Sequence, residues 1–321
     1  MRWGILGLGT IADEFAATMQ RNGQPVYAAA SRTAQKAERF AQQYQITRTY
    51  ASYEAMLADP QIDIVYVATP HCNHAQWIRA SLLANKHVLC EKAITVSASE
   101  LMELVALARQ RDRVLSEAMT IYHMPLYTAL RQMLHDGVLG ELKMIQVSFG
   151  SHKDYDVKNR FFNPDLAGGA LLDIGTYALS FARWFLSEQP DTVLTAYHPF
   201  ETGVDEKAGI ILQTPDAQMA TIALTMRAKM PKRGIVAGEK GYFVVDDFPR
   251  ADHALWICTD GKQQEIKEGD TAQALWYEAK DMEAYVRGEK TNVLPLSIDV
   301  MDLMTQIRQQ WGMWYPFESQ T

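Results

Sequence analysis

The sequence has few cysteines and no long apolar run. Its three cysteines, Cys72, Cys90 and Cys258, are widely spaced among 321 residues and form no C-x-x-C pair. This usage fits a reducing compartment, so we expect a cytoplasmic protein with no bound metal. No stretch approaches the roughly 20 apolar residues that a membrane helix needs. The apolar run that follows Arg2 is also too short for a signal peptide.

Positive charge is in the minority as well. The chain has 31 Lys and Arg against 38 Asp and Glu, which gives a formal net charge of −7. Binding to nucleic acid or to an anionic membrane usually needs a broad basic surface. We therefore expect a small-molecule substrate and neither a nucleic acid nor a membrane as partner. The length favours two domains over one.

Short apolar runs alternate with helical patterns in the first third of the chain. This order is typical of β-α-β units with a buried parallel sheet. Strands are predicted at 2–6, 26–30, 64–67 and 88–90, and helices at 11–21, 34–43, 53–57, 74–84 and around 101–108. These elements predict an α/β Rossmann domain, a doubly wound parallel sheet, over residues 1–122.

Apolar residues beyond Tyr122 repeat with a period of two, as in Ile145, Val147 and Phe149. Such a period indicates half-exposed antiparallel strands. Further strands are predicted at 193–197, 209–213, 220–224, 235–237, 242–245 and 255–258, and helices at 124–135, 172–185, 274–287 and 298–311. The order predicts an α+β domain with an open, mostly antiparallel sheet over residues 123–321.

A glycine-rich turn directly follows the first predicted strand. Gly7, Gly9, Thr10 and Ile11 belong to a G-x-G-x-x-A sequence that opens the first helix. Glycine allows the backbone to approach a pyrophosphate at a helix N-terminus. The alternative, a plain strand-to-helix turn, is less favoured in this context.

The end of the second strand indicates which dinucleotide is bound. An NAD site usually has a carboxylate there, whereas this chain has Ser31 and Arg32, with Lys36 one helical turn later. A guanidinium pairs well with a 2′-phosphate. NADP is therefore the predicted cofactor and NAD the less favoured one, unless Arg32 and Lys36 are simply solvated.

Two more segments end buried strands at the same edge of the sheet, where ligands of doubly wound domains bind. The residues expected to contact the cofactor there are Thr69, Pro70, His71, Asn73, His74, Glu91 and Lys92. A metal site at His71, Cys72 and His74 is the weaker alternative, because no second ligand cluster matches it.

A second glycine-rich segment places two reactive groups on one predicted helix face. Gly168 and Gly169 precede Asp173 and Tyr177, which are four residues apart. A lysine, a carboxylate and a phenol beside a nicotinamide could move a hydroxyl proton. Free tyrosine has a pKa near 10, and an ammonium stabilises its anion. The alternative is that Tyr177 packs in the core and Asp173 caps a helix.

Together these motifs resemble the Gfo/Idh/MocA family of nicotinamide oxidoreductases. Tyr177 stands where many members have histidine, which is typical of the branch that contains dimeric dihydrodiol dehydrogenases and glucose–fructose oxidoreductases. Three stretches carry that likeness: 88–92, 168–173 and 201–205.

The resemblance implies that Lys92 and Tyr177 are the catalytic pair and that Asp173 orients substrate hydroxyls. It also implies NADP as cofactor, aldoses and cyclic trans-diols as substrates, and a homodimer formed through the second-domain sheet. Tyr122, Arg160 and Phe162 are expected to bind substrate. The family motif continues Glu-Lys-Pro, whereas this chain has Ala93, and this departure bears on the placement of Lys92.

The leading expectation is an NADP-dependent dehydrogenase or reductase that acts on a hydroxyl or carbonyl of a sugar-like or trans-vicinal-diol substrate. A non-catalytic NADP(H)-binding regulator of the same fold is the alternative, with Ala93 as its one hint. An NAD-linked sugar-phosphate enzyme is a third possibility.

Overall fold

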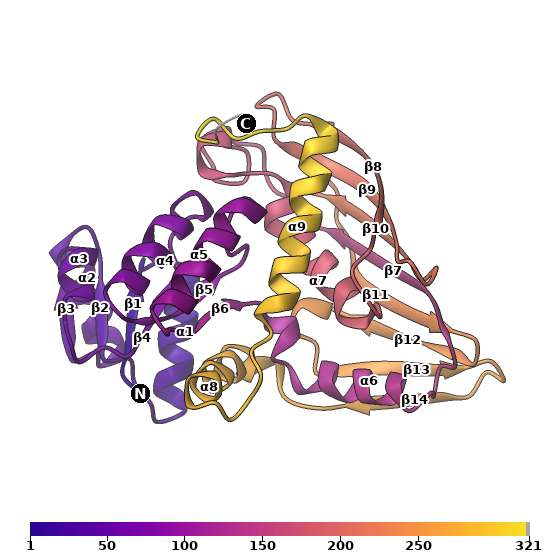
Figure 1. Ribbon diagram of the computed structural model, residues 1–321, viewed down its shortest axis with the longest axis horizontal. Helices are drawn as coiled ribbons and strands as arrows, with labels where there is room; N and C mark the ends of the chain where they lie inside the picture. The colour runs from indigo at the N-terminus through magenta and orange to yellow at the C-terminus, as the bar shows by residue number, and fades with distance from the viewer. Residues whose placement is uncertain (319–321) are drawn as a thin grey trace. The chain divides into compact units, whose positions relative to one another are not determined.

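The chain divides into two compact units in the computed structural model, which describes residues 1–318 (Figure 1). The first unit comprises Met1–Ala118 and Ala272–Pro295, and the second comprises Met119–Thr271 and the chain from Leu296 onward. The first boundary thus lies four residues before the expected one. The return of 272–295 to the first unit was not expected, because a helical pattern alone does not show which unit a helix packs against.

A six-stranded parallel sheet forms the centre of the first unit, in the order β3-β2-β1-β4-β5-β6. Its strands are β1 (Trp3–Leu6), β2 (Ala28–Ala30), β3 (Arg48–Tyr50), β4 (Ile64–Val67), β5 (His87–Glu91) and β6 (Leu115–Ala118). Its helices are α1 (Thr10–Arg21), α2 (Ala34–Tyr44), α3 (Tyr53–Leu57), α4 (His74–Leu83), α5 (Ala98–Gln110) and α8 (Ala274–Arg287). The predicted doubly wound domain is confirmed.

Helix α8 joins this unit because its apolar face enters the same core as α1. Leu275 and Met282 of α8 belong to one buried cluster with Phe15 and Tyr66, whose rings stack at 4.0 Å. The indole N–H of Trp3 donates a hydrogen bond of 3.0 Å to Glu283. The late segment therefore completes the core of the N-terminal domain.

Two strands of this sheet escaped prediction, for opposite reasons. Strand β3 lies at the edge of the sheet and is largely exposed, so Arg48 and Thr49 give no apolar signal. Strand β6 is buried throughout but contains Ser116 and Glu117, which interrupt the apolar run. Periodicity misses both cases.

An eight-stranded sheet organises the second unit, in the order β14-β13-β12-β11-β7-β10-β9-β8. Neighbouring strands are antiparallel except for the parallel pair β7 and β10, so the expected mostly antiparallel sheet is confirmed. The strands are β7 (Leu142–Gly150), β8 (Thr192–Pro199), β9 (Asp205–Gln213), β10 (Met219–Thr225), β11 (Met230–Gly238), β12 (Gly241–Asp246), β13 (His253–Cys258) and β14 (Gln263–Lys267). The polar edge strand β14 was not predicted.

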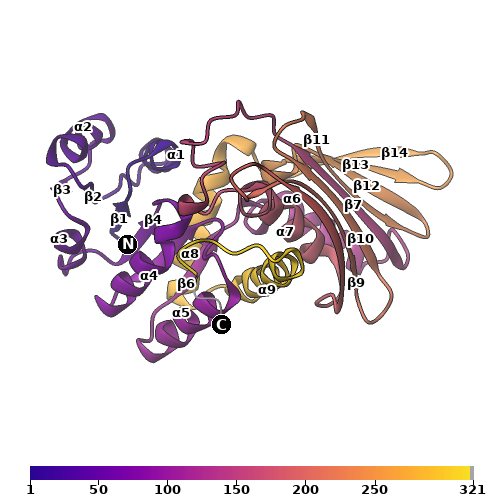
Figure 2. The same ribbon diagram turned by 90° about the horizontal axis from the view of Figure 1, so that it is seen from above.

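The helices of this unit, α6 (Pro125–His135), α7 (Thr176–Phe185) and α9 (Leu294–Trp311), lie on one side of the sheet (Figure 2). Phe181 of α7 packs on Gly234, where a Cβ would lie 2.2 Å from the ring. Trp311 of α9 stacks on Tyr197 of β8 at 4.5 Å. No helix within residues 1–318 covers the opposite face of the sheet.

Neither a membrane-spanning helix nor a metal-binding cluster is present within residues 1–318. No helix there is long and apolar enough to cross a membrane. No three His, Cys, Asp or Glu side chains between residues 1 and 318 gather closely enough to hold a metal ion.

Candidate active site

The glycine turn leads from β1 into α1 with a backbone that requires glycine. Gly7 has a φ of +88°, and a Cβ there would lie 2.7 Å from the carbonyl oxygen of Ala68. Gly9 is exposed, a Cβ there would meet no atom within 4 Å, and the residue precedes α1 without a side-chain cap. Thr10 is exposed and Ile11 half-buried. The N–H groups at this helix start are therefore suited to an anionic dinucleotide.

Ser31 and Arg32 directly follow β2. Ser31 is buried and its backbone N–H donates to the carbonyl of Tyr50 at 3.2 Å. The side chains of Arg32 and Lys36 are exposed on the turn into α2 and on its first turn. Burial raises the pKa of Tyr53, and the positive charge of Arg32 opposes that rise. A cation is thus present beside the position where a ribose is held in this fold class.

The loop after β4 presents one polar atom with no partner. The hydroxyl oxygen of Thr69 is buried and has no hydrogen bond to the described residues. Pro70 is exposed, and Asn73 is half-buried at the start of α4. An unsatisfied hydroxyl at the carboxyl edge of the sheet fits a polar ligand such as a dinucleotide.

The two histidines of this loop bind the backbone around Lys92. The Nε2 of His71 lies 3.0 Å from the carbonyl oxygen of Lys92, and the Nδ1 of His74 lies 2.9 Å from that of Ala93. The Nε2 of His74 also lies 2.7 Å from the carbonyl oxygen of Thr69. Burial lowers the pKa of His74, although these carbonyl contacts oppose the change. Both rings hold the segment that carries Lys92, a role that the sequence alone did not suggest.

Two buried carboxylates also bind the segment that carries Lys92. Glu91 accepts a hydrogen bond from the hydroxyl of Tyr66 and another from the backbone N–H of Lys92, the latter at 3.3 Å. Glu117 on β6 accepts from the N–H of Ile94 at 3.0 Å. The Lys92–Ala93 peptide bond is cis. Lys92 itself is half-buried.

In the second unit, Asp173 and Tyr177 lie on consecutive helical elements. Asp173 belongs to a π-helical turn, η4 (Leu171–Gly175), and Tyr177 is the second residue of α7. The predicted single helix is therefore a π turn followed by an α-helix. Asp173 is buried, whereas Tyr177 is half-buried with its ring centroid 6.3 Å from that of Phe149. A guanidinium nitrogen of Arg160 lies 3.5 Å from the carboxylate of Asp173.

The structure places the residues expected to bind substrate in different environments. Arg160 is exposed, and its guanidinium lies 4.3 Å from the ring centroid of Phe161. Phe162 is fully buried and packs edge-on against Phe200 at 4.7 Å. Tyr122 is also buried, with its ring stacked on Trp184 at 5.6 Å. Arg160 therefore forms an ion pair with Asp173, while Phe162 and Tyr122 lie in packed aromatic clusters.

Comparisons with known proteins cover nearly the whole chain. Residues 1–119 match the model of an "Oxidoreductase family, NAD-binding Rossmann fold", and residues 127–244 match the "GFO/IDH/MocA C-terminal domain". The chain is 31% identical to a trans-1,2-dihydrobenzene-1,2-diol dehydrogenase of Xenopus tropicalis, over 98% of this chain and 99% of the relative. The enzyme of that name from Mus musculus is 34% identical, over 98% of each chain.

Solved structures show the same architecture. The 3-ketoreductase KijD10 of Actinomadura kijaniata, solved with NADP and TDP-benzene, has a TM-score of 0.86 and 26% identity over 96% of this chain and 97% of its own. An aldose-aldose oxidoreductase of Caulobacter crescentus has a TM-score of 0.87 over 97% of this chain and 98% of its own. At 22% identity, that second likeness shows the fold alone.

A glycine turn on a parallel sheet, joined to a second unit with an open sheet, defines here a nicotinamide-dependent oxidoreductase that acts on CH–OH groups. The chain belongs to the Gfo/Idh/MocA oxidoreductase family.

Proposed function

We propose that the protein is an NADP-dependent dehydrogenase or reductase for a hydroxyl or carbonyl of a sugar-like or trans-vicinal-diol substrate. The observation that carries this proposal is the pairing of a buried Asp173 with a half-exposed Tyr177 at the start of α7. A carboxylate and a phenol at this spacing suit a substrate that carries neighbouring hydroxyls. The diol dehydrogenases that the chain resembles over 98% of its length support the same substrate class.

The proposed chemistry assigns a role to each polar group. Tyr177, as tyrosinate, accepts the hydroxyl proton during oxidation and returns it during reduction. Lys92 stabilises the tyrosinate and binds the same oxygen, and Asp173 orients an adjacent hydroxyl. Arg160 fixes the Asp173 carboxylate, while Tyr122 and Phe162 support the surrounding aromatic packing. The nicotinamide, when bound, accepts or supplies the hydride.

NADP is the proposed dinucleotide because cations, and no carboxylate, follow β2. Arg32 would pair with the 2′-phosphate and Lys36 would add a second positive charge. Gly7 and Gly9 would admit the pyrophosphate, and the unpartnered hydroxyl of Thr69 would contact the nicotinamide half. The complex of KijD10 with NADP supports this choice.

Replacement of Tyr177 by phenylalanine tests the proposal. We expect Tyr177→Phe to lower kcat on the order of a hundredfold and to leave the dissociation constant of NADPH unchanged, because the phenol acts on the proton. The assay is a panel of aldoses, inositols and cyclic trans-diols followed through NADPH absorbance. NADPH binding without turnover of any compound by the wild-type protein would favour the regulator instead. An unchanged kcat in the Tyr177→Phe variant would eliminate the role of Tyr177.

The exposed face of the eight-stranded sheet is proposed to form a homodimer. Leu194 of β8 pairs with Ile211 of β9, and both side chains are exposed, at 59% and 38%. The same row passes through the polar Thr221 and Gln146 and then reaches the half-buried Ile235, Val244 and Leu255. Exposed apolar side chains such as Leu194 and Ile211, on a sheet face without helices, suit contact with a second copy of the chain. Ile211→Asp should then give a monomer in light scattering, and an unchanged mass would refute this contact.

A cytoplasmic location is also proposed, because the cysteines are few and form no disulfide. The three cysteines form no disulfide with one another, which suits a reducing compartment.

A further inference from the structure

The stretch 201–205 is one of the three stretches that carry the likeness to the family, yet the proposed chemistry uses none of its residues. Its last residue, Asp205, begins β9 and is fully buried. One carboxylate oxygen of Asp205 accepts a hydrogen bond from the backbone N–H of Leu171 at 2.7 Å. Leu171 is the first residue of η4, the turn that carries Asp173.

The other carboxylate oxygen of Asp205 lies against the glycine pair. Gly169 has a φ of +114°, and a Cβ there would lie 2.1 Å from Oδ1 of Asp205. The backbone N–H of Asp173 in turn donates to the carbonyl of Gly169 at 3.3 Å. The carboxylate thus occupies the space that a side chain at position 169 would need, and it fixes the start of the turn.

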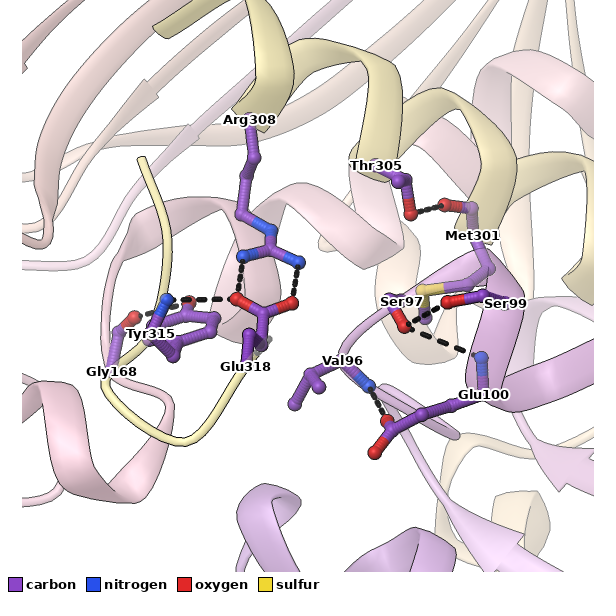
Figure 3. A network of polar contacts seen from close by, with 10 residues as sticks. All are labelled: Val96, Ser97, Ser99, Glu100, Gly168, Met301, Thr305, Arg308, Tyr315 and Glu318. Atoms are coloured by element: carbon purple, nitrogen blue, oxygen red, sulfur yellow. Dashed lines mark hydrogen bonds and ion pairs between the residues drawn. The ribbon is translucent and has the colours of Figure 1, made fainter. Parts of the chain in front are cut away.

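The C-terminal segment binds the same glycine pair (Figure 3). The buried hydroxyl of Tyr315 donates to the carbonyl of Gly168 at 2.7 Å. Glu318 accepts two hydrogen bonds from the guanidinium of Arg308, at 2.7 and 2.8 Å, and a third from the backbone N–H of Tyr315 at 2.8 Å. The guanidinium of Arg308 also lies 4.8 Å from the ring centroid of Tyr315.

Because these charged groups are buried, they lose their hydration, and packing alone does not explain why they are placed here. Arg308 and Asp205 are 2% and 0% exposed, and buried charges usually stabilise a fold no better than apolar residues of similar size. The positive charge of Arg308 also lowers the pKa of Asp205, which opposes the larger rise caused by burial. What these polar groups add over apolar ones is direction, because hydrogen bonds fix the backbone at Gly168 and Leu171.

We propose that Asp205 and Tyr315, the latter held by the Arg308–Glu318 ion pair, are positioning residues that set the backbone of 168–171 and thereby place Asp173 and Tyr177 for the substrate. They touch neither substrate nor cofactor. The inference rests on the proposed function, since it assigns these groups to the same reaction.

Two tyrosines of the second unit allow a matched test. Tyr315→Phe removes a buried hydroxyl that donates to a backbone carbonyl in the glycine pair. Tyr127→Phe removes a buried hydroxyl that donates to the backbone carbonyl of Phe248, outside that pair. In the full-length protein we expect Tyr315→Phe to lower kcat about tenfold with little change in the dissociation constant of NADPH, because small displacements of reacting groups are costly. Tyr127→Phe should leave kcat unchanged at a comparable loss of stability.

A second readout does not need turnover. Amide hydrogen exchange of the protein without ligands should become faster at 171–177 in Tyr315→Phe and remain at the wild-type rate there in Tyr127→Phe. At position 205, Asp205→Asn keeps an acceptor for the N–H of Leu171 and should retain more kcat than Asp205→Ala. The Tyr315 comparison holds even if the alanine variant does not fold.

The proposal is overturned if both tyrosine variants change kcat equally, or if exchange at 171–177 is the same in both. Faster exchange with an unchanged kcat in an active enzyme also overturns it. A wild-type protein without turnover would refute the proposed function instead. The exchange comparison would then decide alone whether these residues hold the Tyr177 segment.

Discussion

The pH dependence of stability at Asp205 follows from its burial. Burial raises the pKa of Asp205 from 3.8 to about 6, and the backbone N–H of Leu171 and the charge of Arg308 act in the opposite direction. In the unfolded chain the pKa returns to its usual value near 4. The Asp205→Asn variant keeps the shape of the side chain and removes its titration.

The sign of the effect is set by which state binds the proton more tightly. Because the pKa is higher in the folded protein, the stability contributed by the protonated carboxyl is fully present below pH 3.8 and is lost as the pH rises through about 6. At 1.36 kcal/mol for each pKa unit, the whole change is about 3 kcal/mol. About 2 kcal/mol of it should fall between roughly pH 4.5 and pH 7.5.

Urea unfolding followed by circular dichroism measures this difference. The unfolding free energy of the wild-type protein, taken relative to Asp205→Asn, should decrease by about 2 kcal/mol between those two pH values. Asp216→Asn is a control that should stay flat over this range, because hydrogen bonds from Thr214 and Ser187 lower the pKa of the exposed Asp216 below 3.8 and its contribution is lost only at lower pH. A difference between wild type and Asp205→Asn that stays constant with pH would refute the reasoning about burial.

Three further outcomes test the first unit. Arg32→Ala should weaken NADPH binding about tenfold or more and leave NADH binding nearly unchanged in fluorescence titrations, whereas the exposed Arg39 of α2 should tolerate alanine; equal losses for both cofactors would reject the 2′-phosphate contact. Gly7→Ala should lower the unfolding free energy by about 1–3 kcal/mol, because its φ is positive and a Cβ would meet Ala68, while Gly9→Ala should mainly weaken cofactor binding. His74→Leu should lower the unfolding free energy by about 1–3 kcal/mol, because it leaves a buried backbone carbonyl without its donor, and unchanged thermal unfolding would contradict that role.

The sequence predicted those features whose cause is local in the chain. The G-x-G turn is visible because Gly7 and Gly9 lie between an apolar strand and a helix, and the structure places them in that context. Period two similarly identified β7 and β10 from their buried residues. Strand β3 was missed because an exposed edge strand has no apolar period. Assignment of α8 to the first unit also lay outside prediction, because it depends on packing against α1.

The candidate site follows the same division between local and distant causes. Asp173 and Tyr177 could be proposed from their spacing after a glycine pair, but the sequence does not show why that pair is needed. Gly169 must lack a Cβ because the carboxylate of Asp205, 36 positions later, occupies that volume. His74 was expected to contact the cofactor, and its contacts with the backbone carbonyls of Ala93 and Thr69 could not be read from the sequence.

Asp205 and His74 share one property that explains why the sequence did not reveal their contacts. Both side chains are polar and buried, and buried polar groups are almost always hydrogen-bonded. The partner is set by the three-dimensional fold and cannot be read from the local sequence. In each unit that partner is the backbone next to a proposed reactive group: Leu171 before Asp173, and Ala93 after Lys92. If the positioning proposal holds, a substitution at either side chain is expected to displace the backbone next to the proposed reactive group while the group itself stays chemically intact. We therefore expect Asp205, which lies in a family-like stretch, to influence the proposed site through the backbone of Leu171.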